Sequence, residues 1–581
     1  MTEDIREDIL RIALLNAIKH GGKAQKKPVI GRLIAERKEL KQRISTLMHI
    51  IDDIVNNVNK LSLDEQKKLI KEKWPEKIEK TEKKTEKKRK LPPLPNVEKY
   101  KTVVTRFAPN PNAPLHIGQA RAIILSYEYA HMYKGKFILR LEDTDPRLKR
   151  SAIQFFRMIK EDLLWLGCKW DEEYIQSDRI SIYYSYAERL LEEGKAYVCT
   201  CKPEAFRSIV SLKEKCPCRD LEPSDNLYRW DRMLDGTYNE GEAVLRIKTD
   251  LHHPNPAVRD WPAFRIIDTN KYPHPRVGDK YRVWPLYNFA CGIDDHLMGI
   301  THIIRGKEHL TNQIRQEYLY RHLGWEYPEA IHYGRLKIKG APLSKSKILQ
   351  DIKKGIYKDW DDPRLATFVA LRRRGITPEA IRLLMIEVGP RSADITLSWE
   401  NLYAHNRRII DPIAKRYFFV KNPVRLLIEN VPDNFVAKIP FHPDRPTLGF
   451  RKLKIETTDG KAYVLISDSD LHLFKKGSLI RLIGLFNLRI DSAVNRDNVK
   501  GVFLSVRHED AKRLGAHLIH WVPEKENFTC KVIMPDGLTV QGKVERNIQG
   551  EKKNSIVQFE RFGFARVDKV DPPFILFYTH K

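Results

Sequence analysis

The sequence His116-Ile117-Gly118 combines a side chain that can donate a hydrogen bond with a glycine that lets a ligand approach the backbone. It follows a proline-rich loop, and a helical pattern begins at about Ile117 and continues to Tyr133. Unpaired N–H groups and the positive end of a helix dipole favour a phosphate group at such a position. The stretch therefore predicts a triphosphate site, although a lone histidine beside a helix start is more often only a cap.

A second candidate for chemistry is Lys345, in the short polar loop PLSKSK at residues 342–347. Its ammonium group can neutralise the negative charge that develops on a departing pyrophosphate. A single lysine in such a loop is by default a solvated surface residue. Its role depends on whether the fold brings it to His116.

Four cysteines form two Cys-x-Cys pairs that are fourteen residues apart, Cys199 with Cys201 and Cys216 with Cys218. Four thiolates on two tight turns can reach one tetrahedral Zn²⁺ ion. Paired disulfides are the alternative, and they occur inside cells mainly in hyperthermophiles. The remaining cysteines stand alone in the sequence, and we interpret them as buried apolar residues.

The composition favours a polyanionic partner. Lys and Arg number 104 against 76 Asp and Glu, a formal net charge of +28, and nucleic acid is the partner that such an excess suits best. A thermophile-type surface rich in Lys and Glu explains the high total charge but not the imbalance. No apolar run approaches the roughly 18 residues of a membrane span, and the N-terminal MTEDIREDIL carries acids where a secretory signal has bases. We expect a cytoplasmic protein without membrane contact.

These candidates must be positioned by several domains, because 581 residues exceed what one core can hold. Residues 1–63 carry apolar helical stripes and predict a small helical module. Residues 64–100 are rich in Lys and Glu and end near LPPLP, which favours a charged linker. From residue 101 onward, short apolar strands alternate with helical patterns, typical of an α/β domain on a parallel sheet. After Asp411, short alternating runs between Gly, Pro and Asp turns predict β-barrels.

Six motifs follow one another along the chain: RFAPNPNAPLHIGQARA, LRLEDTDP, LGCKWDE, QSDR, PLYNFACGIDDHLMGITHIIRGKEHL and LSKSK. In this order they resemble the catalytic domain of class I glutamyl- and glutaminyl-tRNA synthetases. The strand-rich residues 411–581 resemble the anticodon-binding β-barrels of the archaeal-type glutamyl enzymes, whereas the bacterial enzymes are helical there. Residues 1–63 resemble the helical extension of archaeal members.

The resemblance implies a Rossmann-type class I catalytic domain in two halves, residues 101–197 and 284–410. Between them, residues 198–283 would form an acceptor-end-binding insertion with a structural zinc knuckle. The second half would include helices along the tRNA stem, where the run Arg372-Arg373-Arg374 is a candidate for phosphate contacts; a solvated helix end is the alternative. Residues 411–581 would be the all-β anticodon-binding barrels.

The resemblance also implies a reaction and its residues. ATP and an amino acid form an aminoacyl-adenylate with loss of pyrophosphate, and the tRNA then takes the acyl group. His116 and Lys345 would be catalytic, and the expected ATP site comprises Pro109, Asn110, His116, Gly118, Gln119, Leu343, Ser344, Lys345 and Ser346.

This chain departs from the family signatures at four positions. Gln119 stands where the family has a second histidine, and its amide can donate a hydrogen bond but cannot be cationic. Ala113 replaces a glycine, which restricts the loop if positive φ is needed. Pro342 and Leu343 replace the first lysine and the methionine of the Lys-Met-Ser-Lys-Ser signature, so Lys345 is the one lysine of the signature that is retained.

The expected amino-acid site comprises Arg106, Glu142, Tyr287 and Arg305. Arg305 falls where glutamyl enzymes carry Arg and glutaminyl enzymes carry a small neutral residue. Two guanidinium groups suit a carboxylate, because charge-assisted bonds strengthen in a dry site. The alternative for Arg305 is a surface salt bridge to Glu308 at helical spacing. On this basis the substrate is expected to be L-glutamate.

The expected cofactors are ATP, Mg²⁺ and a structural Zn²⁺, and the expected partner is tRNA(Glu), with the protein a monomer. The sequence leaves open whether tRNA(Gln) is also charged. A glutaminyl-tRNA synthetase is the nearest alternative, a small-molecule adenylyltransferase is an alternative from another reaction class, and a non-catalytic RNA-binding relative is a third.

Overall fold

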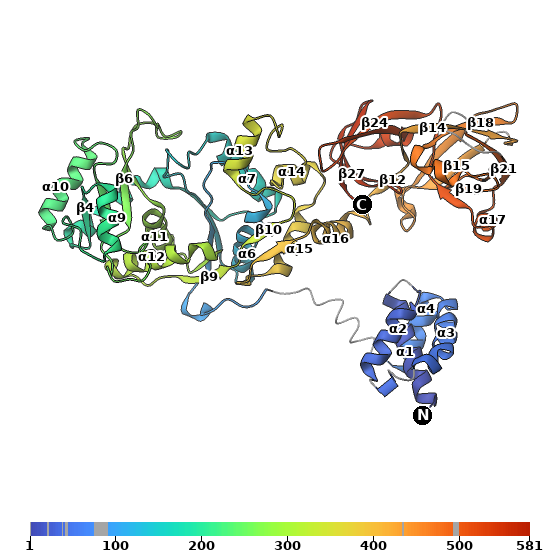
Figure 1. The fold of residues 1–581 in the computed structure, drawn as a ribbon, viewed down its shortest axis with the longest axis horizontal. Coiled ribbons are helices and arrows are strands. Elements are labelled where there is room, and N and C mark those ends of the chain that lie inside the picture. The colour runs from blue at the N-terminus through green and yellow to red at the C-terminus, as the bar shows by residue number, and fades with distance from the viewer. Residues whose placement is uncertain are drawn as a thin grey trace. The chain divides into compact units, whose positions relative to one another are not determined.

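The computed structural model describes residues 2–19, 22–37, 39–40, 44–74, 91–432, 435–491 and 499–581. The chain divides into two compact units, Met1–Lys90 and Leu91–Lys581, each with a hydrophobic core of its own (Figure 1). Among the described residues, no helix combines the length and the apolar character that crossing a bilayer requires.

The first unit is a helical module, as predicted. Helix α1 is its central element, because it packs against each of the other three helices. Ile9 and Val29 are fully buried in the shared core, and the apolar stripe of α3 adds Ile51. The described helices are α1 (Thr2–Lys19), α2 (Lys26–Glu36), α3 (Ile44–Lys60) and α4 (Leu63–Lys73).

The predicted boundary of this module at residue 63 is too early, because α4 begins there and continues to Lys73. Ser62 and Glu65 form a capping box: the Ser62 hydroxyl accepts from the Glu65 N–H, and the Glu65 carboxylate accepts from the Ser62 N–H. Of the predicted linker, residues 75–90 lie outside the described residues. Residues 91–100 belong to the second unit, where Leu91 and Leu94 are buried.

The second unit contains the predicted parallel sheet. β1 (Val104–Phe107), β2 (Lys136–Leu141) and β3 (Glu172–Ile175) pair in parallel, as do β8 (His302–Gly306) and β9 (Glu329–Tyr333). β8 lies beside β1, since the Thr301 N–H donates to the Val104 carbonyl at 3.0 Å. The resulting strand order is β3-β2-β1-β8-β9. The chain adds β2 and β3 on one side of β1 and β8 and β9 on its other side, so the switch point lies between β1 and β8. Ligands of open α/β sheets bind at the carboxyl ends of strands at such a switch point.

Helices and short strands complete the catalytic region. Helix α6 (Ile117–Met132) packs on β1, β2 and β8. The other elements are α7 (Ile153–Trp165), α11 (Tyr287–Leu297), α12 (Leu310–Leu323), β10 (Leu336–Ile338), α13 (Lys345–Lys353), α14 (Phe368–Arg373), α15 (Pro378–Val388), β11 (Ile395–Leu397) and α16 (Trp399–Ile410), with 3₁₀ turns η2 (Val97–Lys99), η3 (Gln176–Arg179) and η4 (Lys307–His309).

The insertion is an antiparallel four-stranded sheet with helices around it. Its core also takes residues from α8 and α11, so the insertion is anchored on the elements that flank it. The sheet spans residues 196–285, slightly wider than the predicted 198–283. Its elements are α8 (Ile180–Glu192), β4 (Ala196–Cys199), α9 (Pro203–Ser211), α10 (Pro223–Leu234), β5 (Val244–Ile247), β6 (Pro262–Ile266) and β7 (Val283–Pro285).

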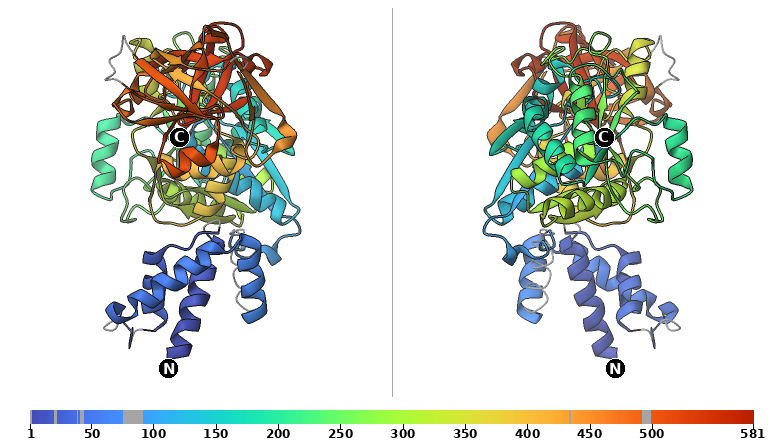
Figure 2. Two further views of the ribbon diagram at one scale, coloured as in Figure 1. Left: turned by 90° about the vertical axis from the view of Figure 1, so that its right-hand side faces the viewer. Right: turned by 90° about the vertical axis from the view of Figure 1, so that its left-hand side faces the viewer.

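The C-terminal region is rich in strands, as predicted, and Figure 2 shows them in orange and red. One sheet has the order β12-β26-β27-β28-β24-β25-β13; its edge strands β12 (Lys415–Tyr417) and β13 (Phe419–Lys421) are consecutive, so the sheet closes on itself. Its other strands are β24 (Asn527–Ile533), β25 (Thr539–Glu545), β26 (Ile556–Phe559), β27 (Gly563–Lys569) and β28 (Phe574–His580).

The second sheet of this region has the order β17-β18-β14-β21-β20-β19-β22, with β23 on β18. Because β22 and β23 are adjacent in the chain and pair at opposite ends, this sheet also closes. Its elements are β14 (Pro423–Glu429), β17 (Thr457–Thr458), β18 (Lys461–Ser467), β19 (Leu479–Leu482), β20 (Asn487–Arg489), β21 (Val499–Ser505), α17 (His508–Arg513), β22 (His517–Ile519) and β23 (Val522–Pro523), with a hairpin of β15 (Phe435–Pro440) and β16 (Phe450–Ile455) beside them.

Candidate active site

A cavity of about 860 Å³ lies at the carboxyl ends of β1 and β8, at the switch point of the sheet. It gathers predicted residues from five separate parts of the chain. Those that line it are Arg106, Pro109, Asn110, His116, Gly118, Gln119, Glu142, Tyr287, Arg305 and Leu343. The predicted Ser344, Lys345 and Ser346 follow Leu343 directly at the start of α13 and do not line the cavity wall.

His116 is both the N-cap of α6 and part of the cavity wall. Its Nδ1 accepts a hydrogen bond from the Gly118 N–H at 3.1 Å. Burial and, to a smaller extent, the charge of Lys345 together lower the pKa of His116 to about 4, so the ring is neutral at pH 7. Because Nδ1 accepts, the ring proton sits on Nε2. The cap therefore fixes the tautomer that can donate to a phosphate oxygen.

The two loops predicted to hold ATP meet at Gly118. A Cβ atom at this position would lie 2.9 Å from the His116 ring and 3.3 Å from the Leu343 Cδ1 atom. Lys345 also reaches this region, since its Nζ donates to Asn112 Oδ1 at 3.2 Å. His116 and Lys345 therefore lie on the same side of the molecule, close enough for the lysine charge to act on the histidine.

Two of the departures from the family signatures, Gln119 and Ala113, have structural explanations. Gln119 completes a capping box, because its Oε1 accepts from the His116 N–H at 3.3 Å and its amide N–H groups stay free to donate. Ala113 is buried and does not adopt positive φ, so this loop has no need of glycine there.

Beneath the cavity, buried arginines and carboxylates form a paired cluster. Arg106 holds Asp295 with two bonds of 3.1 and 3.3 Å, and Arg140 bonds Asp295 at 2.7 Å and Glu142 at 3.1 Å. Burial raises the pKa of Asp295, but Arg106 and Arg140 outweigh it and lower the pKa to about 2. The charge of Arg106 is therefore largely compensated before any substrate binds.

Arg305 lies in a different electrostatic environment. It is 5% exposed, on strand β8, and lines the cavity. Its three hydrogen-bond partners are uncharged, and no described carboxylate lies within salt-bridge distance. The alternative prediction, a surface salt bridge to Glu308, is wrong, because Arg305 is buried in a strand and Glu308 instead folds against Gly306. Arg305 thus presents an uncompensated buried positive charge to the cavity.

The remaining cavity wall is basic, which the sequence analysis missed. Arg265 is paired with Asp145 at 2.7 Å. Four further lining cations have no ion pair among the described residues: Lys149, Arg315, Arg335 and Lys337. They come from three separate segments, since Arg335 and Lys337 are neighbours in the sequence, so no local pattern could have assembled all four. Such a rim suits a polyanionic substrate.

The Arg372-Arg373-Arg374 run is engaged by the protein itself. Arg372 bonds Asp162 at 3.1 Å, and Arg373 bonds Asp361 at 2.6 Å. Arg374 is 2% exposed and donates to the Tyr403 hydroxyl and the Thr579 carbonyl. The alternative, a solvated helix end, is therefore wrong for Arg374, which is not accessible to a phosphate, whereas the side chains of Arg372 and Arg373 remain 37% and 34% exposed.

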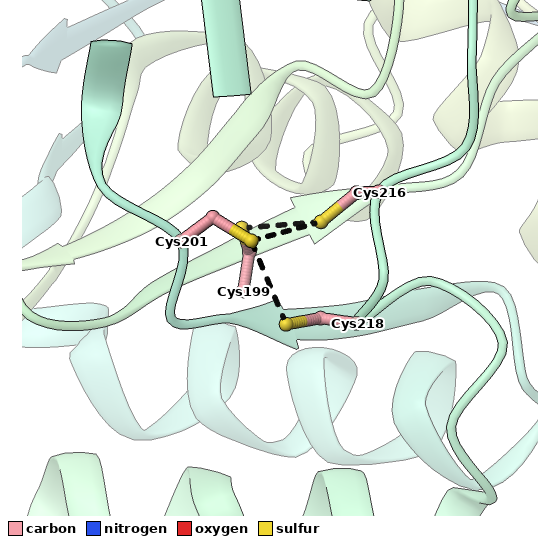
Figure 3. A group of neighbouring side chains, drawn as sticks. All are labelled: Cys199, Cys201, Cys216 and Cys218. Atoms are coloured by element: carbon pink, nitrogen blue, oxygen red, sulfur yellow. Dashed lines mark hydrogen bonds between the residues drawn. The ribbon is translucent and has the colours of Figure 1, made fainter. Parts of the chain in front are cut away.

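The four predicted zinc ligands converge at one point (Figure 3). All four Sγ atoms lie within 4.8 Å of one another, with Cys199 to Cys216 at 3.6 Å, Cys201 to Cys216 at 3.5 Å and Cys201 to Cys218 at 4.0 Å. Zn–S bonds of about 2.3 Å in a tetrahedron place sulfurs about 3.8 Å apart. No cysteine forms a disulfide. The donor set and its spacing fit a structural Zn²⁺ ion.

Comparison with known proteins agrees with this geometry. The family described as "tRNA synthetases class I (E and Q), catalytic domain" matches residues 102–412, and two anticodon-binding domains of the same group match residues 414–508 and 518–568. The chain is 53% identical to the glutamate–tRNA ligase of Pyrococcus furiosus and 52% identical to that of Thermococcus kodakarensis, over 100% of each chain. It is 45% identical to that of Methanothermobacter thermautotrophicus, over 99% of this chain and 100% of the relative. The chain therefore belongs to the class I tRNA synthetases of the glutamate and glutamine group.

Proposed function

We propose that the protein is a glutamate–tRNA ligase, which activates L-glutamate with ATP and transfers it to the 3′-terminal adenosine of tRNA(Glu). The observation that carries this proposal is Arg305, a buried cation without a carboxylate partner in the cavity wall. A substrate carboxylate supplies the missing negative charge. The names of the full-length relatives support the same choice.

The preference for glutamate follows from the charge balance. Placing a neutral glutamine amide against Arg305 leaves the guanidinium under-compensated, at a cost of roughly 1–3 kcal/mol. A cost of that size is about 5- to 150-fold in relative binding. Arg106 contributes less to this preference for a carboxylate than the sequence alone indicates, because Asp295 already forms an ion pair with it.

In the proposed first step, an oxygen of the α-carboxylate of glutamate attacks the α-phosphorus of ATP, and the bond from that phosphorus to pyrophosphate breaks. The His116 Nε2–H donates to phosphate oxygens, and the Lys345 ammonium neutralises the leaving pyrophosphate. Glu142 lines the cavity where it can accept from the substrate ammonium. Mg²⁺ bound with ATP would add positive charge on the phosphates. In the second step a ribose hydroxyl of the tRNA attacks the acyl carbon, and AMP leaves.

The cavity rim and the barrels would bind the RNA. The rim cations suit the negatively charged acceptor end, and the C-terminal barrels match anticodon-binding domains. Whether tRNA(Gln) is also a substrate is decided by charging each purified isoacceptor separately.

The test is amino-acid-dependent exchange of labelled pyrophosphate into ATP, with tRNA present. We expect exchange with glutamate at least about tenfold faster than with glutamine. Faster exchange with glutamine would make the protein a glutaminyl-tRNA synthetase. Exchange with another small molecule that does not respond to tRNA would indicate an adenylyltransferase, and no exchange would indicate a non-catalytic RNA-binding protein.

A further inference from the structure

The uncompensated charge of Arg305 depends on the three side chains that hold it. Arg305 Nη1 donates to Gln316 Oε1 at 3.1 Å, Nη2 donates to the Tyr327 hydroxyl at 2.9 Å, and Nε donates to His332 Nε2 at 3.4 Å. These bonds use three of the five N–H groups of a guanidinium. Two N–H groups remain for a ligand in the cavity.

All three partners are neutral at physiological pH. Burial lowers the pKa of His332 to about 4, with a further contribution from Arg305, so its Nε2 keeps the lone pair that accepts the bond. Burial also raises the pKa of Tyr327 to about 12. The third partner, Gln316, is a permanently neutral amide. None of the three partners therefore offsets the positive charge of the buried Arg305.

Three arginines near Arg305, the buried Arg106 and Arg140 and the partly buried Arg179, are bonded differently. Arg106 and Arg140 share Asp295, and Arg179 bonds Asp294 at 2.8 Å. A carboxylate thus neutralises each of them. Arg305, in contrast, is hydrogen-bonded to the side-chain amide of Gln316, whereas these neighbours are bonded to carboxylates.

The side-chain amide of Gln316 is held by hydrogen bonds at both its oxygen and its nitrogen. Its side chain is fully buried on α12, and its Oε1 accepts from both Arg305 and the Tyr327 hydroxyl, the latter at 2.8 Å. Its Nε2 faces the Asn288 carbonyl at 3.5 Å. Two donors meet the oxygen and a carbonyl meets the nitrogen, so the amide orientation is determined by its surroundings.

We propose that Gln316 is a specificity-determining positioning residue: its neutral amide orients Arg305 without neutralising it, and so reserves the charge of Arg305 for the side-chain carboxylate of the amino acid. This inference rests on the proposed function, because it assigns the source of the preference for glutamate over glutamine. A glutamate at position 316 has nearly the same shape but places an anion at hydrogen-bond distance from the guanidinium. That anion satisfies Arg305 and repels a second carboxylate, whereas it leaves a neutral amide substrate unaffected.

The experiment compares Gln316→Glu with Gln313→Glu in the full chain, by steady-state exchange with glutamate and with glutamine at saturating ATP and tRNA. Gln313 lies one helical turn earlier on α12, bonds Glu317 and does not line the cavity, so it is a matched charge control. We expect Gln316→Glu to lower the glutamate-to-glutamine ratio of kcat/KM at least about tenfold, mainly through a higher KM for glutamate. The KM for ATP and the ratio in Gln313→Glu should not change.

A second variant, Gln316→Met, removes the acceptor without adding charge. It should raise the KM for glutamate with no gain for glutamine, and it provides the test if Gln316→Glu does not fold. An unchanged ratio in either folded variant overturns the inference. So does a parallel loss with both amino acids, because that pattern marks a merely structural role. Absence of glutamate-dependent exchange in the unmodified chain would instead overturn the proposed function.

Discussion

The charge of Lys345 depends on its surroundings as well as on pH. Burial and, to a smaller extent, the nearby charge of Lys149 together lower the pKa of its ammonium group to about 8. A lowered lysine pKa means that the cation is present below about pH 8 and is lost as pH rises above it. Since kcat/KM reports the free enzyme, we expect kcat/KM for ATP to fall up to about tenfold per pH unit above pH 8. Initial rates of exchange across pH 6 to 10 measure this limb.

Replacing Lys345 with arginine is the control for this profile. Arginine keeps its charge at every pH in that range, so the alkaline limb should disappear even if the absolute rate drops. His116 does not contribute to this limb, because its pKa is lowered to about 4. A profile that declines equally in both proteins would assign the limb to another group.

At the same scale, motif positions beside strand ends could be named from sequence, including Arg106, Glu142 and Arg305. Their partners could not. Asp295 meets Arg106 across 189 residues, and Gln316 reaches Arg305 from the following helix. Which groups neutralise a buried charge depends on which strands and helices are neighbours, and local sequence does not record that.

At the scale of single elements, the cysteine knuckle joins the end of β4 to the loop after α9. Its apolar support is small, with Phe206 and Val210 as the main buried contributors besides the cysteines. A structural zinc can contribute on the order of 10 kcal/mol to local folding. We expect about one zinc per chain by elemental analysis, and a lower thermal unfolding temperature after treatment with a strong chelator.

Cys216→Ser supplies the comparison for the zinc prediction. The variant should unfold at a lower temperature, and chelation should then cause little further loss. If a thiol reductant alone produced the loss, disulfides would account for the knuckle instead, although the sulfurs here are at least 3.5 Å apart and an S–S bond is about 2.05 Å.

The first and last residues of elements and domains are harder to predict from the sequence than their types. The capping box of Ser62 and Glu65 marks the start of α4, yet the high density of Lys and Glu after it led to the prediction of a linker. The type of each region was readable because hydrophobic periodicity switches between helical and strand patterns. The edges of the insertion were not, because its core borrows residues from α8 and α11.

At the scale of the whole second unit, one short helix, α14, connects the loop that carries His116 to the C-terminal barrels. Before α14, the Ala366 carbonyl accepts from the Ile117 N–H at 3.0 Å, and after it Arg374 donates to the Thr579 carbonyl of β28 at 3.2 Å. Arg566 of β27 also donates to the Arg373 carbonyl at 2.9 Å. The catalytic region and the C-terminal barrels therefore both contact α14 within one compact unit.

The division of the chain into two units predicts which truncation is tolerated. A chain that begins at Leu91 keeps the segment that anchors the second unit: the Leu94 N–H donates to the Tyr133 hydroxyl at 2.9 Å, and the Pro95 carbonyl lies 2.9 Å from His302 Nε2. We expect this chain to retain glutamate-dependent exchange within about twofold, because no cavity residue is removed.

The matched comparison is a chain that begins at Val103 and therefore lacks twelve more residues than the chain that begins at Leu91. It loses the buried Leu91 and Leu94, each contributing about 1.5–3 kcal/mol, together with the two hydrogen bonds to the sheet and α6 region. Its free energy of unfolding should therefore fall by several kcal/mol, measured in denaturant, while the chain from Leu91 keeps the stability of the second unit. Equal stability of the two truncated chains would mean that residues 91–102 are a tether after all. Loss of exchange in both would mean that the first unit takes part in activation, and the site would then extend beyond the cavity at the switch point.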